Sequence, residues 1–149
     1  MNDALGRALA PRGGAVGVAA ASVRVVAGAA FVVIGSGKFV DHLQEAVDFR
    51  GYGIPLPDLA VWVSGTVEVL GGALLVLGLA TRFAAAALTV NLAVAISTAG
   101  LMEGGAFHLG VGPALLLAMA FLLWAGGGAW SLDGRLAAVA RRHRQPTLS

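Results

Sequence analysis

Residues 59–80, LAVWVSGTVEVLGGALLVLGLA, form an apolar run interrupted by a single charged residue, Glu68. A helix needs about 20 consecutive apolar residues to cross the hydrocarbon core of a bilayer. The run meets that length, and it does not alternate apolar and polar residues as the strands of a membrane barrel do. Because lipid offers no partners for backbone N–H and C=O groups, the stretch predicts a transmembrane helix.

Three further stretches have the same character and predict three more spans, at residues 13–37, 83–102 and 107–126. The first carries one charge, Arg24, and the other two carry none. The sequence therefore predicts an all-α membrane protein, a four-transmembrane-helix bundle that forms one domain over residues 1–149. A basic N-terminus before an apolar run also suits a secretory signal peptide, but the length of this run favours a retained span.

The composition supports a membrane protein and excludes other classes. Of the 149 residues, 58% are hydrophobic and 12% are charged, whereas a soluble domain carries about 25% charged residues. The hydrophobicity excludes disorder. The basic residues are scattered rather than clustered on one face, so no nucleic-acid partner is expected. The chain has no cysteine, which excludes disulfides, thiolate metal sites and dithiol redox chemistry by this chain alone.

The distribution of lysine and arginine predicts the orientation. Loops with more of these residues face the cytoplasm, so both termini are expected there. Residues 38–58 then form an outer loop, and residues 134–149 form a basic cytoplasmic tail. The arginines on the predicted inner side are Arg7, Arg12, Arg82, Arg135, Arg141, Arg142 and Arg144, and the outer side carries Lys38 and Arg50.

The loop and the tail have some structure of their own. Residues 38–49 repeat apolar side chains at helical spacing, which predicts a short interfacial helix or an extension of the first span. Residues 50–58 contain two glycines and two prolines, which predict a turn before the second span. In the tail, residues 136–140 are expected to form a short helix.

Arg24 and Glu68 lie near the middle of consecutive, antiparallel spans. A charged side chain at the centre of a transmembrane helix costs about 2.5–3.5 kcal/mol on the insertion scale. Such groups usually face the bundle interior and pair, so the sequence predicts an Arg24–Glu68 ion pair. Two interpretations of the pair stay open. It fixes the register of two helices, or it forms the polar part of a ligand or proton site.

Three other polar residues are candidates for a site. Lys38 lies seven and fourteen residues after Phe31 and Arg24, so the three share one stripe of the first span. Asn91 lies mid-span, where an amide either joins helices or contacts a ligand. His108 opens the last span, but no histidine or carboxylate partner lies at the helical spacing of metal ligands, so no metal site is predicted.

Several sequence blocks, in order, resemble the DoxX family of four-helix membrane proteins. The similarity includes Arg24 and runs to about Asp133, with one departure where Gly127 or Gly128 replaces a proline common in the last block. The blocks are GSGKF (35–39), YGIPLP (52–57), EVLGG (68–72), LGLATR (77–82) and GGGAWSLD (126–133).

The resemblance implies a bundle with cytoplasmic termini in a bacterial inner (plasma) membrane. The family is named for a subunit of a thiosulfate:quinone oxidoreductase, which implies an oxidoreductase-associated membrane subunit. On that hypothesis the chain anchors a redox partner and offers Arg24, Glu68 and Lys38 to the oxygens of a quinone. It is not catalytic alone, because it lacks a redox centre of its own.

Two alternatives stay open. In the first, the chain is a non-catalytic scaffold or assembly subunit of a larger complex, and the buried Arg–Glu pair is purely structural. In the second, the mid-membrane charges carry a small molecule or a proton, although the chain lacks the internal repeats of most transporters. Glycine-rich helix faces are compatible with a homo-oligomer, and lipid is a partner in every case.

Overall fold

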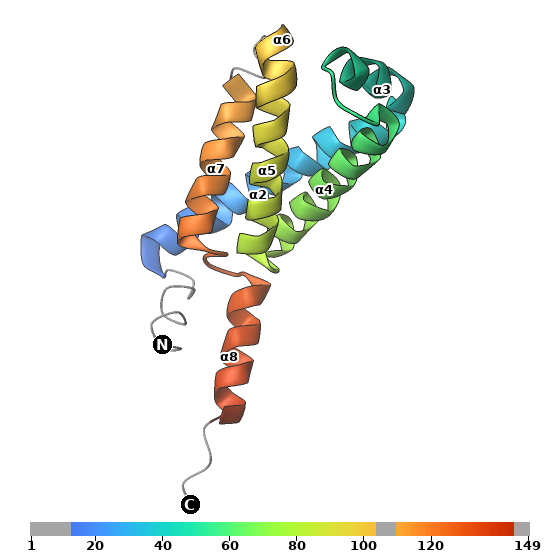
Figure 1. Ribbon diagram of the computed structural model, residues 1–149. Helices are drawn as coiled ribbons and strands as arrows, with labels where there is room; N and C mark the ends of the chain where they lie inside the picture. Colours follow the sequence, from blue (N-terminus) through green and yellow to red (C-terminus); the bar gives the residue numbers. More distant parts are fainter. Residues whose placement is uncertain (1–12, 104–109, 145–149) are drawn as a thin grey trace, which may run out of the picture.

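The computed structural model describes residues 13–103 and 110–144, and within these ranges all regular structure is helical. Four helices, α2, α4, α5 and α7, pack as a bundle (Figure 1). The predicted fold class, an all-α four-helix bundle, is confirmed. The elements are α2 (Gly14–Val40), α3 (His42–Gly51), α4 (Pro57–Leu77), α5 (Thr81–Ala95), a π-helical turn (Ile96–Gly100), α6 (Leu101–Glu103), α7 (Gly112–Ala125) and α8 (Leu132–Arg144).

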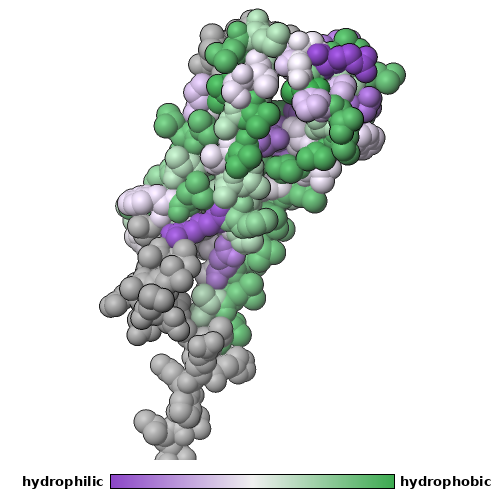
Figure 2. All heavy atoms as spheres, viewed as in Figure 1, coloured by the Kyte–Doolittle hydropathy of each residue, from purple (hydrophilic) through white to green (hydrophobic). Residues whose placement is uncertain are grey.

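Three of these helices are long and apolar enough to cross a membrane: α2, α4, and α5 continued through Gly100. The fourth, α7, is apolar but shorter. His108 and the start of the predicted fourth span lie outside the described residues. Figure 2 shows hydrophobic residues over most of one face of the bundle, with hydrophilic residues gathered toward its two ends. This distribution is that of a protein whose middle faces lipid.

Glycine ends the second span where the chain must reverse direction. Gly78 adopts a left-handed conformation, with φ of 69°, which glycine reaches without steric cost. The N–H groups of Gly78 and Leu79 donate to the carbonyls of Leu75 and Leu74, at 3.1 and 3.0 Å. This is a Schellman motif. It stops α4 at Leu77, before the predicted boundary at residue 80, and allows α5 to start at Thr81.

The closest helix contact joins α2 and α4 through paired glycines. A Cβ atom added to Gly28 would lie 2.7 Å from the carbonyl oxygen of Gly72, and one on Gly72 would lie 2.6 Å from that of Gly28. About two helical turns further along α2, a Cβ on Gly35 would lie 3.0 Å from the Gly65 carbonyl oxygen. Small residues allow this approach of two backbones in a membrane, and they set the register between the two helices.

The C-terminal helix is longer than the sequence predicts. α8 begins at Leu132 rather than at residue 136. The hydroxyl of Ser131 accepts a hydrogen bond from the Gly134 N–H at 3.2 Å, as an N-cap residue does. The predicted helix is present, but its start was placed too late because the prediction followed the apolar residues of the tail and did not use the capping serine. α8 leaves the bundle at the end where α2 begins (Figure 1).

We expect Gly72→Ala to destabilise the protein and Gly37→Ala not to. At Gly72 the new methyl group meets a backbone oxygen that cannot move freely, and such overpacking costs about 1–3 kcal/mol. At Gly37 nothing lies within 4 Å of an added Cβ, so the better helix propensity of alanine adds up to about 1 kcal/mol. Thermal unfolding of both variants in one detergent measures the difference. Equal midpoints would contradict the glycine contact.

Candidate functional site

A cluster of polar side chains lies inside the bundle around Glu68. Glu68 is 5% exposed, and its carboxylate is bound on both oxygens. The Lys38 ammonium donates to Oε2 at 2.9 Å, and the Asn91 amide Nδ2 donates to Oε1 at 2.8 Å. The three residues come from α2, α4 and α5, so the cluster joins three helices and supplies the carboxylate with the partners that a buried charge requires.

The predicted Arg24–Glu68 ion pair is wrong. Arg24 is buried, at 3% exposed, but its Nη1 donates to the backbone carbonyls of Leu75 and Val76, each at 2.8 Å. These are among the last carbonyls of α4, where donors from the next helical turn run out, and that of Leu75 also accepts from the Gly78 N–H of the C-terminal turn. Arg24 therefore stabilises the end of a helix and is not part of the Glu68 cluster.

The glycine contact explains why the two charges do not meet. With Gly28 against Gly72 and Gly35 against Gly65, residue 24 of α2 faces residue 76 of α4. Glu68 precedes that position by eight residues, which is about 12 Å along a helix. Lys38 follows Arg24 by fourteen residues and lies on the same face of α2. Its side chain, and not that of Arg24, reaches Glu68.

Asp133, near the start of α8, also holds the α4–α5 turn. The sequence analysis did not single out this residue. Its carboxylate accepts hydrogen bonds from the N–H groups of Ala80 and Thr81, at 2.7 and 2.9 Å. It thereby caps the start of α5, although it lies more than fifty positions further along the chain. The Asp133 N–H also donates to the carbonyl of Gly78, at 3.0 Å. The feature of the sequence that could have identified Asp133 is an acidic residue just after a predicted span.

The helix α3 folds back against α4. His42 lies 3.7 Å from an Asp58 oxygen, and its ring centroid is 4.9 Å from that of Trp62. Burial raises the pKa of Glu45, and the positive charge of Lys38 partly offsets this by lowering it. Glu68 and two carboxylates of the α3 region raise the pKa of Glu45 further.

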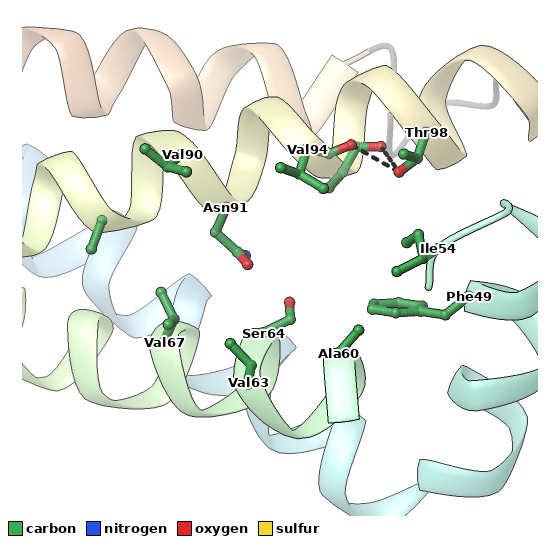
Figure 3. Close-up of a pocket in the computed structure, with 12 residues that line it drawn as sticks. Phe49, Ile54, Ala60, Val63, Ser64, Val67, Val90, Asn91, Val94 and Thr98 are labelled. Carbon is green, nitrogen blue, oxygen red and sulfur yellow. Dashed lines mark hydrogen bonds between the residues drawn. The ribbon is translucent and has the colours of Figure 1, made fainter. Parts of the chain in front are cut away.

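A groove of about 490 Å³ opens between α4 and α5. Figure 3 shows Asn91 projecting into it from α5, opposite Ser64 and Val67 of α4, with Phe49 and Ile54 at the end near α3. The lining is mostly apolar and includes Val63 and Val90, which are 55% and 65% exposed. The groove is therefore accessible from the side of the bundle that would face lipid.

A small enclosed cavity lies behind the groove, next to the Glu68 cluster. Its volume is about 80 Å³, and its lining includes Lys38 and Glu68. Ser64, Phe49 and Ala95 line both the cavity and the groove. A water molecule occupies about 30 Å³ in the liquid, so the cavity has room for about two. The Lys38–Glu68 pair is thus separated from the lipid-facing groove by side chains that line both spaces, while Asn91 of the same cluster lines the groove itself.

The structure brings together three of the five candidate residues: Lys38, Glu68 and Asn91. Arg24 lies at the α4–α5 turn, and His108 falls outside the described residues. Sequence analysis did not single out Glu45, which lies in the segment expected to form an interfacial helix of the outer loop. It also missed the groove, because a groove depends on how two helices diverge and not on any motif.

Comparison with known proteins places the chain in a family. The DoxX family model matches residues 19–101, a region that contains Arg24, Lys38, Glu68 and Asn91. The chain belongs to the DoxX family. It is 36% identical to an uncharacterized membrane protein of Mycobacterium tuberculosis, over 76% of this chain and 78% of that protein. It is 34% identical to an uncharacterized protein of Haemophilus influenzae, over 77% and 88% of the two chains. No solved structure matches the chain.

Sequence blocks that resemble DoxX proteins contribute to two polar sites. The 77–82 and 126–133 blocks meet at the α4–α5 turn, where Arg24 and Asp133 hold the backbone. The block of residues 35–39 supplies Lys38 and the block of residues 68–72 supplies Glu68, which pair near the middle of α4. This DoxX protein is a multi-pass membrane protein, and residues of these blocks form two separate polar sites.

A double-mutant cycle tests which cation pairs with Glu68. Each of Lys38→Met and Glu68→Leu should cost about 3–5 kcal/mol, because the remaining partner keeps a buried charge without compensation. The double variant should cost much less than the sum. Arg24→Met combined with Glu68→Leu should be additive within about 0.5 kcal/mol. Unfolding in detergent measures all five variants, and strong coupling between Arg24 and Glu68 would contradict this assignment.

Proposed function

We propose that this DoxX protein is a membrane subunit of a quinone-linked redox complex, and that the α4–α5 groove binds the quinone head group. The observation that carries the proposal is a lipid-accessible groove with an amide, Asn91, at its inner wall and a buried ion pair directly behind it. The relatives named above are bacterial, and the proposed location is the bacterial inner membrane.

The dimensions and the lining of the groove support a ligand of this class. Small-molecule sites occupy about 300–1,000 Å³ and combine apolar walls with a few polar groups. Here the walls are mainly valine and alanine, and the polar side chains are Ser64, Asn91 and Thr98. A flat apolar ring with carbonyl oxygens matches this arrangement, and an isoprenoid tail would leave through the open side into lipid.

Asn91 is the group best placed to bind a carbonyl oxygen. Its amide nitrogen carries two hydrogens, and one of them is directed to Glu68. The other is available to a ligand in the groove. In this proposal Lys38 and Glu68 hold the amide in position, and Arg24 takes no part because its hydrogen bonds go to the end of α4.

In this proposal the electrons come from another protein. The chain has no cysteine, and among residues 13–103 and 110–144 no cluster of three histidines, aspartates or glutamates could hold a metal ion. A partner that carries the redox centre is therefore part of the proposal. The bundle anchors that partner and presents the quinone to it.

Binding of a short-chain quinone to the purified protein tests the groove. We expect decylubiquinone to bind the full chain in nanodiscs, and Ser64→Leu to weaken binding by at least about tenfold. The leucine would fill the inner part of the groove and remove no partner of Glu68. A tenfold change corresponds to about 1.4 kcal/mol. Equilibrium binding of a radiolabelled quinone provides the measurement.

Ser36→Leu is the matched control for that variant. Ser36 is exposed, and its hydroxyl bonds only to the Val32 carbonyl of its own helix. The same chemical change should therefore leave binding unaltered. If both variants bind as the wild type does, or if the wild type does not bind, the groove is not a quinone site.

Isolation of the native protein from its own membranes tests the partner. In a mild detergent we expect a redox enzyme to co-purify in a fixed ratio, as identified by mass spectrometry. A partner without any redox centre would favour the scaffold function instead. Recovery of this chain alone, as a monomer or a homo-oligomer, would overturn the subunit proposal.

A further inference from the structure

The polar side chains that line the α4–α5 groove differ in what they offer a ligand. Asn91 offers both kinds of hydrogen bond, because Glu68 occupies only one of its amide hydrogens and its carbonyl oxygen stays available. The Ser64 hydroxyl has no hydrogen-bond partner among the residues that the structure describes, so it can donate or accept. Thr98 differs from both, because its hydroxyl hydrogen is already in use.

The Thr98 hydroxyl is bound to the backbone of its own helix. Its Oγ1 donates to the carbonyl of Val94 at 2.8 Å, and the carbonyl of Ala95 lies 3.4 Å away. Figure 3 shows both contacts at the edge of the groove. A hydroxyl group has one hydrogen and two lone pairs. With its hydrogen directed to the backbone, Thr98 is a hydrogen-bond acceptor for any ligand in the groove.

The spacing of Asn91 and Thr98 suits a ring with a polar group at each end. Both residues line the groove, and they lie seven positions apart on one helix face, about 10 Å along the axis. The two oxygens of a para-quinone or its quinol, each extended by a hydrogen bond of about 2.8 Å, span a similar length. The Phe49 ring lies on the wall opposite Thr98 (Figure 3), where it would contact the face of such a ligand.

The oxidised and reduced forms of a quinone differ in what they gain at Thr98. A quinone carbonyl has no hydrogen to donate, so it would have to draw the hydroxyl hydrogen away from Val94, and one hydrogen bond would replace another. A quinol hydroxyl donates to a lone pair of Thr98 and leaves the bond to Val94 in place. Only the reduced form therefore gains a hydrogen bond here. Asn91 does not offset this difference, because it can bind a carbonyl or a hydroxyl.

We propose that the α4–α5 groove binds the quinol form of its ligand more tightly than the quinone form, and that Thr98 determines this preference as a hydrogen-bond acceptor. The inference rests on the proposed function, because it requires that the groove binds a quinone. It adds the redox state that the site retains. A site that binds the reduced form more tightly makes reduction of the bound quinone more favourable, so it suits a partner that delivers electrons to the quinone.

The affinities of the two forms test the inference. The full chain in nanodiscs is titrated with decylubiquinone and, in the absence of oxygen, with decylubiquinol, and empty nanodiscs correct for partition into lipid. We expect the quinol to bind about three- to tenfold more tightly, which is the range of one net hydrogen bond. Equal affinities, or tighter binding of the quinone, would overturn the inference and leave the proposed function intact. Absence of binding by either form would overturn both.

Two variants of Thr98 show whether its hydroxyl is responsible. Thr98→Val keeps the branched shape and removes the acceptor, so quinol affinity should fall by about three- to tenfold while quinone affinity stays unchanged. Thr98→Ser keeps a hydroxyl and should keep the preference. A Thr98→Val variant that still prefers the quinol would contradict the assignment.

Thr89→Val is the matched control on the same helix. The Thr89 hydroxyl makes the same kind of bond, to the Ala85 carbonyl at 2.7 Å, but Thr89 is not among the residues that line the groove. The same chemical change should therefore leave both affinities unaltered. If Thr89→Val lowers quinol affinity as much as Thr98→Val does, the effect comes from the helix and not from a contact with the ligand, and the inference is wrong.

Discussion

The close approach of α2 and α4 determines where every other polar group in the bundle lies. Two pairs of glycines bring the helix backbones so near that a single methyl group would meet a carbonyl oxygen. Because an α-helix advances about 1.5 Å per residue, one such contact fixes the relative depth of all residues on both helices. It places Lys38 within reach of Glu68 and leaves Arg24 at the C-terminal end of α4.

The two polar sites that result have different chemical characters. At the α4–α5 turn, Arg24 and Asp133 satisfy backbone groups that helix ends leave without partners. Their charges interact with carbonyl and amide dipoles. Near the middle of α4, Lys38 and Asn91 bind a side-chain carboxylate next to a cavity and a groove. The first arrangement satisfies backbone groups, whereas the second places polar side chains beside a space that a ligand could enter.

The sequence alone allowed the fold class to be predicted, because each span is a long apolar run. In lipid the backbone N–H and C=O groups of such a run must bond to one another, which a helix allows. It also allowed Lys38, Glu68 and Asn91 to be selected, since polar groups are costly in such runs. The pairing of Glu68 could not be derived, because it depends on a register set by glycines in a chain that has 22 of them. Asp133 was missed for a related reason. It acts on a segment that is distant in sequence, and only the folded chain shows which segment that is.

The scaffold interpretation explains part of the Glu68 cluster but not all of it. A buried lysine–glutamate pair with an amide on the second oxygen is satisfied internally and would be sufficient to hold three helices in register. Such a role does not require an opening that leads from the lipid-facing side to Asn91. Closing this opening with apolar side chains would bury more surface and add stability. The proposed ligand site accounts for the opening, because a ligand from the bilayer needs an accessible polar group.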